Sequence, residues 1–529
     1  MTKSYDALIV GGGHNGLVCA FYLARAGLKV LVLERRHIVG GAAVTEEFHP
    51  GFRNSTASYT VSLLQPKVIA DMRLPDRGLR IVERPLANFF PWPDGYLKLG
   101  GGMARTQAEF ARFSQADATA YPAYDAALQR LADVLRGLAL QVPPNAGGGL
   151  GALISAARQA WPFTRLDIEA QRDLLSVFTL SAREFLDRWF EDDHIKAAFA
   201  FDATVGNYAG VSTPGSAYVL LHHLFGEVNG QRGAWGHAIG GMGAITQAMA
   251  SACRDMGVEL RLEAPVARVL CDGGRATGVR LESGEEIAAR IIAANPGPAL
   301  LFRQMVDPAD LPADFRRRME GFKTGSGSFR MNLALSELPD FTVLPGKDQA
   351  EHHGAGIVIA PGLDYMDRAF DDARVHGWSR QPIVELTIPS TLDPALAPQG
   401  AHVASLFCQH FAPELPDGRS WDEAREEAAD CIIDTVTAHA PNFRSSIVAR
   451  QIHSPLDLER KFGLVGGDIF HGRMSLDQLW SARPMLGHGD YRAPIKGLYM
   501  CGSGTHPGGG VTGAPGHNAA RIILADQRI

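Results

Sequence analysis

The fold of this 529-residue chain is decided by residues 5–36, which read YDALIVGGGHNGLVCAFYLARAGLKVLVLERR. Residues 6–10 form a short, mostly apolar run, typical of a strand that is buried on both faces. Residues 17–26 predict a helix that ends at a glycine, and residues 30–33 predict a second buried strand. The stretch is therefore expected to form a β-α-β unit.

The turn after the first strand carries the pattern of a dinucleotide-binding site. Gly11, Gly13 and Gly16 supply G-x-G-x-x-G: the first glycine permits the tight turn, the second lets the backbone approach a pyrophosphate, and the third lets helix and strand pack closely. The N-terminus of the helix directs free N–H groups at the phosphates. Glu34 closes the second strand, where a carboxylate binds the ribose hydroxyls of adenosine and disfavours a 2′-phosphate.

Composition narrows the class of protein. The chain has 46% hydrophobic and 20% charged residues, as in ordinary soluble globular proteins, and its length leaves room for about three domains. A formal net charge of −6 without a long basic block predicts no nucleic-acid partner. There is no apolar run of about 18 residues, the length of a spanning helix. The first strand begins within a few residues of Met1, so we expect a cytoplasmic protein without a signal peptide.

The six cysteines do not indicate a redox or metal site. No two of them form a C-x-x-C pair, the usual spacing of a dithiol centre or a zinc site. We expect buried, reduced thiols and no metal ion. The six are Cys19, Cys253, Cys271, Cys408, Cys431 and Cys501.

Two further glycine-rich segments are expected beside a long cofactor. Gly40 and Gly41 follow the second strand, where a glycine pair suits close passage of a phosphate or ribityl chain, although an ordinary turn is the alternative. Residues 497–504 predict a buried strand that ends in glycines, and residues 506–513 form a second glycine-rich loop. The helix predicted over residues 514–524 would point its N-terminus at a group that gains negative charge, such as a flavin that accepts hydride.

The segment between residues 67 and 231 is predicted to be mostly helical, as in a lid or cap over a substrate. Helices are expected at residues 114–140, 150–161, 167–190 and 192–205. We expect residues 150–161, which are rich in apolar residues and poor in charge, to form a core helix. A helix resting on a membrane surface is the alternative.

The rest of the chain predicts strands and one polar loop. Residues 258–262, 266–270, 276–281 and 286–293 read as strands without a second nucleotide motif. Strands at residues 328–336, 356–360, 383–390 and 402–410 suggest a mainly antiparallel sheet, followed by a long helix over residues 421–440. Residues 463–484 read as a long loop dense in polar groups, which favours a functional site.

These segments together resemble the FAD-dependent phytoene desaturase family of carotenoid oxidoreductases. The similarity is greatest to the branch of pyridine nucleotide-disulfide oxidoreductase domain-containing proteins, and it spans essentially the whole chain. Residues 40–47, 466–480 and 501–510 carry it. The disulfide chemistry in the branch name has no counterpart in this sequence, which lacks a redox cysteine pair and a second nucleotide-binding domain.

The resemblance implies an α/β fold with two domains. A discontinuous, Rossmann-like FAD-binding domain would comprise residues 1–65, 233–325 and 480–529. An inserted α+β substrate domain would comprise residues 66–232 and 326–479, with a helical cap over a mixed, mainly antiparallel sheet.

The resemblance also implies the residues that hold FAD. Many relatives have an arginine after the glycine pair, whereas Ala42 and Ala43 stand here, so a charged contact must come from elsewhere or be absent. Carried over position by position, the cofactor-binding residues are Gly11, Gly13, Gly16, Glu34, Arg35, Gly40, Gly41, Ala42, Val266, Asn295, Gly502, Ser503, Val511, Thr512 and Gly513.

The activity implied is the FAD-dependent dehydrogenation of a lipophilic, carotenoid-like small molecule. His506 is the first candidate for a polar group beside the isoalloxazine, with a role in bracing its loop as the alternative, and Asp477 and Arg483 are further catalytic candidates. Two other functions stay open: isomerisation or saturation of a polyene without net oxidation, and a flavin-bound protein that acts through partner or peripheral membrane contacts. The sequence gives no indication of the oligomeric state.

Overall fold

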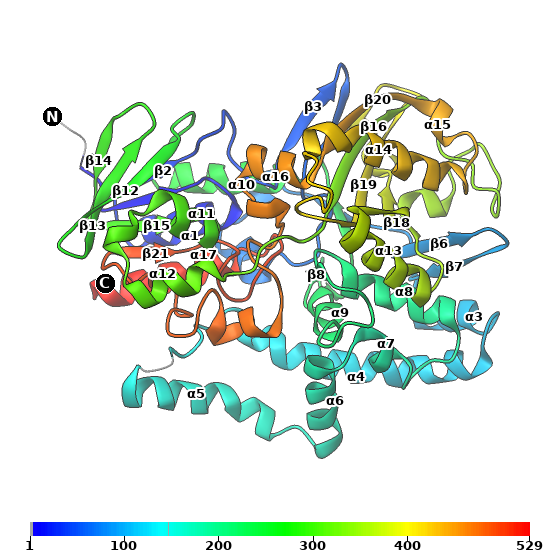
Figure 1. Cartoon of the computed structure of the whole chain (residues 1–529), viewed down its shortest axis with the longest axis horizontal. Helices are drawn as coiled ribbons and strands as arrows, with labels where there is room; N and C mark the ends of the chain where they lie inside the picture. The colour runs from blue at the N-terminus through cyan, green and yellow to red at the C-terminus, as the bar shows by residue number, and fades with distance from the viewer. Residues whose placement is uncertain (1–3, 146–147, 529) are drawn as a thin grey trace.

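The computed structural model describes residues 4–145 and 148–528. Figure 1 shows two sheets side by side, with a parallel sheet and its helices at one end of the long axis and a larger sheet at the other. A group of helices lies along one edge of the molecule beneath both. The chain therefore folds as an α/β protein with a Rossmann-like part and an α+β part, as predicted.

The parallel sheet brings together strands from three distant parts of the chain. All four neighbouring pairs run parallel, and β1 lies in the middle of the sheet. Its strand order is β11 (Glu259–Arg261), β2 (Val30–Leu33), β1 (Ala7–Val10), β15 (Ile291–Ala294) and β21 (Leu498–Met500).

Both faces of this sheet are covered, which explains the uninterrupted apolar runs of its strands. Ala7 and Ile9 pack among residues of α1 (His14–Arg25), α10 (Met242–Asp255) and α17 (Ala514–Gln527). The alternate residues of β1 pack on the opposite face. That face is covered by the antiparallel strands β12 (Val266–Asp272), β13 (Arg275–Leu281) and β14 (Glu286–Ala288), with α11 (Pro298–Leu300) and α12 (Ala313–Glu320).

The second sheet has seven strands and is antiparallel except for one parallel pair, β6 with β17. The strand order is β20 (Ile447–His453), β16 (Phe329–Leu335), β19 (His402–Phe411), β18 (Trp378–Thr387), β17 (Gly356–Ile359), β6 (Asn88–Trp92) and β7 (Gly95–Leu99). Its associated helices are α13 (Leu363–His376), α14 (Trp421–Thr437), α15 (Phe443–Ser446) and α16 (Pro455–Phe462).

The helical group, the small hairpins and a set of short 3-10 and π-helical turns make up the rest of the described chain. The helices are α3 (Met103–Phe110), α4 (Gln115–Ala139), α5 (Gly149–Thr164), α6 (Ile168–Thr179), α7 (Ala182–Leu186), α8 (Asp193–Thr204) and α9 (Ala217–His223). The remaining elements are β3 (Thr45–His49), β4 (Phe52–Ser55), α2 (Pro66–Asp71), β5 (Ile81–Glu83), β8 (Glu227–Val228), β9 (Gln231–Arg232) and β10 (Gly236–Ala238).

Two local predictions were wrong. Residues 286–293 form two strands in different sheets, because only the apolar run of β15 suits the buried centre of the parallel sheet. Residues 167–190 form two helices, since Ser181 and Glu184 make a capping box that starts α7. The segment of residues 67–231 is mostly helical, as predicted, and it also contains the strands β5, β6 and β7.

The prediction that residues 150–161 form a core helix was also wrong. They lie in α5, none of whose residues is buried, and Leu150 and Leu153 are 73% and 66% exposed. Figure 1 shows α5 lying outermost, along the edge of the helical group. In the described part of the chain, no helix combines the length and the hydropathy needed to cross a bilayer. The exact domain boundaries stay a prediction.

Candidate functional site

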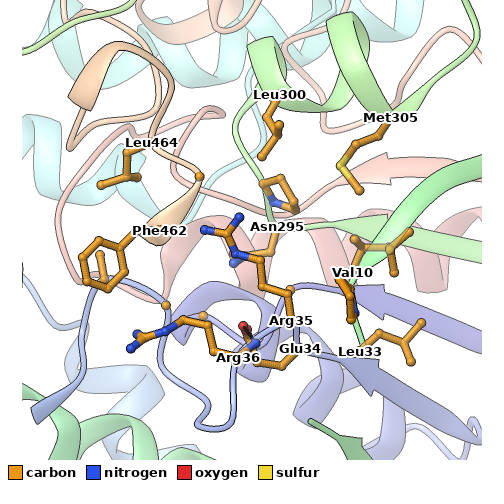
Figure 2. Close-up of a pocket in the computed structure, with 18 of the residues that line it drawn as sticks. Val10, Leu33, Glu34, Arg35, Arg36, Asn295, Leu300, Met305, Phe462 and Leu464 are labelled. Atoms are coloured by element: carbon orange, nitrogen blue, oxygen red, sulfur yellow. Dashed lines mark hydrogen bonds between the residues drawn. The ribbon is translucent and has the colours of Figure 1, made fainter. Parts of the chain in front are cut away.

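A cavity of about 420 Å³ lies at the carboxyl ends of β1, β2 and β15, beside the N-terminus of α1 (Figure 2). Ligands of open α/β sheets bind at this edge, where strand ends and helix N-termini converge. We call it the cofactor cavity. The sequence-predicted residues that line it are Gly11, Gly13, Glu34, Arg35, Gly40, Gly41, Ala42, Val266, Asn295 and Ser503.

The other five predicted cofactor residues do not line this cavity, and two glycines among them serve close packing. A Cβ atom on Gly16 would meet the carbonyl oxygen of Gly11, and one on Gly502 would meet the carbonyl oxygen of Asn295. Each therefore lets two backbone segments beside the cavity approach closely. The remaining three, Val511, Thr512 and Gly513, lie at the N-terminus of α17.

Glu34 fixes the shape of the glycine-rich turn as well as facing the cavity. Its carboxylate accepts one hydrogen bond from the N–H of Gly12, at 2.8 Å, and one from the N–H of Arg36, at 2.9 Å. The side chain is buried. A carboxylate oxygen has two lone pairs, so both oxygens can still accept bonds from ribose hydroxyls.

The cavity wall contains buried polar atoms that fit a dinucleotide. Nε2 of His14, Oδ1 of Asn15 and Nδ1 of His471 are buried and have no hydrogen-bond partner among the described residues. Burial lowers the pKa of His14 to about 4 and that of His471 to about 3, so both rings are neutral at pH 7. Unpaired buried polar groups are costly, and a phosphate or ribityl chain would supply their partners.

Sequence reasoning did not assign these three residues to the site. Two of them stand inside the glycine motif, at positions that the motif leaves unspecified. His471 belongs to the polar loop of residues 463–484, where it was one of several polar residues. The polar pair His14 and Asn15, between Gly13 and Gly16, was the feature of the sequence that could have indicated these contacts.

Positive charge at the cavity comes from the two residues after Glu34. Arg35 and Arg36 both line it, and Figure 2 shows both side chains extending from the end of β2 beside the cavity. Arg36 forms an ion pair with Glu46 at 2.7 Å, and burial lowers the pKa of Arg35. Both arginines line the same cavity as Ala42, so they could supply the charged contact that relatives take from an arginine after the glycine pair.

The three predicted catalytic residues lie in different environments. His506 is buried, and its Nε2 lies 3.0 Å from the carbonyl oxygen of Leu138. Burial lowers its pKa to about 4, so a neutral ring donates this bond at pH 7. The side chain of Asp477 is 57% exposed and pairs with Lys323 at 2.9 Å. The structure therefore does not bring Asp477 to either of the cavities described in this section.

Arg483 binds backbone rather than a cavity. It is fully buried, and burial lowers its pKa to about 10. Its guanidinium donates to five carbonyl oxygens, at distances between 2.6 and 3.3 Å. They belong to Phe470, Gly472, Arg473, Gln478 and Ser503. Arg483 thus fixes the polar loop against the loop that carries Ser503.

A second cavity, of about 370 Å³, lies among α4, α5, α6 and α9. His506 and Trp480 line it, their rings perpendicular with centroids 4.4 Å apart. The other lining residues are Leu135, Leu138, Ala139, Pro144, Ala156, Gln159, Ala160, Phe163, Phe178, Tyr218, Phe225, Leu479 and Pro507. No ionised side chain is among the described residues of this wall at pH 7. We call it the apolar cavity.

One short loop joins the two cavities. Ser503 lines the cofactor cavity and His506 lines the apolar cavity. Three residues span at most about 11 Å when extended, so the two walls approach within that distance along the loop. The loop from Ser503 to His506, both of which were predicted from the sequence as site residues, thus connects the cofactor cavity with the apolar cavity.

Comparison with known proteins decides the family. A family model described as flavin containing amine oxidoreductase matches residues 16–329, more than half of the chain. The chain belongs to this family. The chain is also 42% identical over 550 residues to pyridine nucleotide-disulfide oxidoreductase domain-containing protein 2 of Rattus norvegicus, covering 100% of this chain and 94% of that protein.

Two further similar proteins support the superfamily and the fold, and the flavin is given by the description of the family model. A phytoene desaturase (lycopene-forming) of Pantoea ananas is 25% identical over 526 residues, covering 98% of each chain. The crystal structure of an oxidoreductase from Methanosarcina mazei matches the fold with a TM-score of 0.62 and 15% identity, covering 98% of this chain and 100% of that one. The predicted superfamily is therefore confirmed, and the chain is an FAD-dependent oxidoreductase.

Proposed function

We propose that this flavoprotein dehydrogenates a lipophilic, carotenoid-like molecule bound in the apolar cavity. Two observations carry the proposal. Among the described residues, the wall of the apolar cavity has no ionised side chain, and His506 in this wall lies three residues along the chain from Ser503 in the cofactor cavity. The volume of about 370 Å³ is near the lower end of the ~300–1,000 Å³ typical of small-molecule sites. We therefore expect a compact hydrocarbon or one end of a longer polyene.

The protein's own contribution is to bind, orient and exclude water. When bound, FAD would accept the two electrons and two hydrogens, one as hydride and one as a proton, that leave adjacent carbons when a C–C bond becomes a C=C bond. Burial raises the pKa of Tyr218 in the cavity wall to about 12, so its phenol stays neutral. A wall without charge favours an uncharged substrate, because an unpaired ion would be desolvated there.

An anaerobic substrate screen tests the proposed reaction. The oxidised holoprotein is mixed rapidly with polyenes and with shorter terpenes. A substrate is expected to bleach the flavin absorbance by itself, without any added reductant. Turnover that requires prior reduction of the flavin would instead indicate isomerisation or saturation and would overturn the proposal. If a lipophilic molecule binds but the flavin shows no reaction, a flavin-bound protein that acts through contacts with a partner or a membrane would be favoured.

His506 is proposed to position the loop rather than to accept a proton. Its bond to the Leu138 carbonyl ties the loop to the end of α4, and a base with a pKa of about 4 is weak at pH 7. His506→Ala is expected to slow flavin reduction without loss of FAD. His506→Gln, which can still donate to that carbonyl, is expected to restore most of the rate. Equal loss in both variants would contradict a positioning role.

We also propose that α5 rests on a membrane surface and admits substrate from it. One face of the helix lines the apolar cavity, through Ala156, Ala160 and Phe163. Leu153 and Trp161 are 66% and 59% exposed. The helix contains no acidic residue and one basic residue, so it suits an anionic lipid surface.

Vesicle binding tests this contact. The holoprotein is expected to co-sediment with vesicles that contain phosphatidylserine. A Leu153→Ser/Trp161→Ser variant is expected to bind at least about tenfold more weakly, because two apolar side chains no longer enter the interface. Val375→Ser, which removes a 64% exposed side chain from α13, is the matched control. Equal binding of both variants would refute the role of α5.

A further inference from the structure

A third cavity, of about 250 Å³, lies between α4, α8, α9 and the β6–β7 hairpin. It shares no lining residue with the cofactor cavity or the apolar cavity. Two aspartates line it, Asp125 from α4 and Asp202 from α8. We call it the acidic cavity, and the activity proposed above makes no use of it.

The two carboxylates of the acidic cavity lack a cation. In the part of the chain that the structure describes, neither Asp125 nor Asp202 forms an ion pair. Burial raises the pKa of Asp202 to about 7, with a further contribution from the negative charge of Glu385, and burial also raises the pKa of Asp125. Arg232 lines the same cavity, but its guanidinium is paired with Asp133 at 2.8 Å.

A buried hydroxyl in the wall is also without a partner. Tyr124 is 2% exposed, and its hydroxyl has no hydrogen-bond partner among the described residues. It lines the cavity next to the aspartate that follows it in α4. A buried hydroxyl left unpaired costs free energy, so a ligand that occupies the cavity and bonds to it would be stabilised.

Aromatic rings form another part of the wall. Tyr121, Phe199 and Trp235 line the cavity, and the rings of Tyr121 and Phe199 are stacked with centroids 6.0 Å apart. The negative face of an aromatic ring attracts a cation, most strongly when the cation is desolvated. Carboxylates that lack a counter-ion and aromatic faces that attract cations thus occur in one small cavity.

We infer that the acidic cavity binds a small organic cation, an ammonium group carried on a short apolar frame. Asp202 and Asp125 would balance its charge, and the aromatic rings would contact its alkyl groups. The Tyr124 hydroxyl would bond to a polar atom of the ligand. The volume excludes a long polyene and suits a molecule of a few carbon atoms beyond the ammonium head.

Isothermal titration of the FAD-loaded protein with choline tests the inference. The matched neutral probe is 3,3-dimethyl-1-butanol, which has the same shape and hydroxyl group without the charge. Choline is expected to bind at least about tenfold more tightly than the alcohol. Equal affinity for the two probes, or no binding of either, would overturn the inference.

Variants place the binding in this cavity. Asp202→Asn is expected to weaken choline binding at least about tenfold and to leave binding of the alcohol unchanged. Tyr124→Phe, which removes one hydroxyl, is expected to weaken choline binding a few-fold and serves if the first variant does not fold. Asp371→Asn removes a 69% exposed carboxylate elsewhere and is the control. Choline affinity that is the same in all variants would refute this location.

Discussion

Replacing Arg483 by methionine removes the donor for five buried carbonyl groups. The Arg473 carbonyl keeps a second donor, the side-chain amide of Gln478 at 3.3 Å, so four carbonyls lose their side-chain partner. At ~1 kcal/mol for each buried acceptor left unpaired, the loss is about 4 kcal/mol. Relief of the desolvated guanidinium offsets part of it, which leaves about 2–3 kcal/mol.

Hydrogen exchange followed by mass spectrometry measures this loss locally. Peptides within residues 463–484 of the FAD-loaded variant are expected to exchange about 30–150-fold faster, the ratio that corresponds to about 2–3 kcal/mol. The control is Arg473→Met in the same loop, whose Nε donates to one carbonyl, that of Thr324, at 2.9 Å. If Arg483→Met exchanges no faster than this control, the account of Arg483 as the residue that fixes the loop is refuted.

Two further predictions concern the cofactor turn and the acidic cavity. In Gly13→Ala the new Cβ would lie 2.6 Å from Nδ2 of Asn295, so the fraction of purified protein that carries FAD is expected to fall at least about tenfold. The control is Gly137→Ala, which has open space around its Cβ and should keep full FAD occupancy. Equal FAD occupancy in the two variants would contradict the steric argument. Burial raises the pKa of Asp202 from its ordinary value of 3.8 to about 7 in the folded state. Between pH 3.8 and pH 7 the native state therefore keeps a proton that the unfolded state loses, so the free energy of unfolding falls as pH rises through this range. The gain in melting temperature from Asp202→Asn should therefore grow from pH 4 to pH 8, and a gain independent of pH would argue against the shifted pKa.

The cofactor half of the molecule could be predicted because its physical requirements act over short distances in the sequence. Strand, glycine turn, helix and acid follow one another between residues 6 and 34, and each is constrained by its neighbours. Arg35, which directly follows this unit, was among the predicted cofactor residues, whereas nothing local indicated that Arg36 would also line the cavity. Their placement depends on β11 and on the segment around Phe462, which come from distant parts of the chain.

The other two cavities could not be predicted from sequence because no local pattern encodes them. The apolar cavity needs four helices together with Trp480 and Pro507, and its apolar residues have the same spacing as residues of an ordinary helix core. The carboxylates of the acidic cavity lie on different helices. The polar loop indicated Arg483 as a catalytic candidate, whereas its partners are backbone carbonyls, which every residue carries and which leave no trace in a sequence.

The position of β21 in the parallel sheet determines when the sheet and its site can be completed during protein synthesis. Asn15 donates to the hydroxyl of Ser503 at 3.0 Å across 488 residues of chain. At ~5–20 residues per second, a ribosome needs about 25–100 s to add that length. The first strand, turn and helix therefore emerge early and wait, with apolar surface uncovered, until β21 and α17 arrive. During that interval FAD has only part of its site to bind, because Ser503 and the loop that carries it have not yet been made.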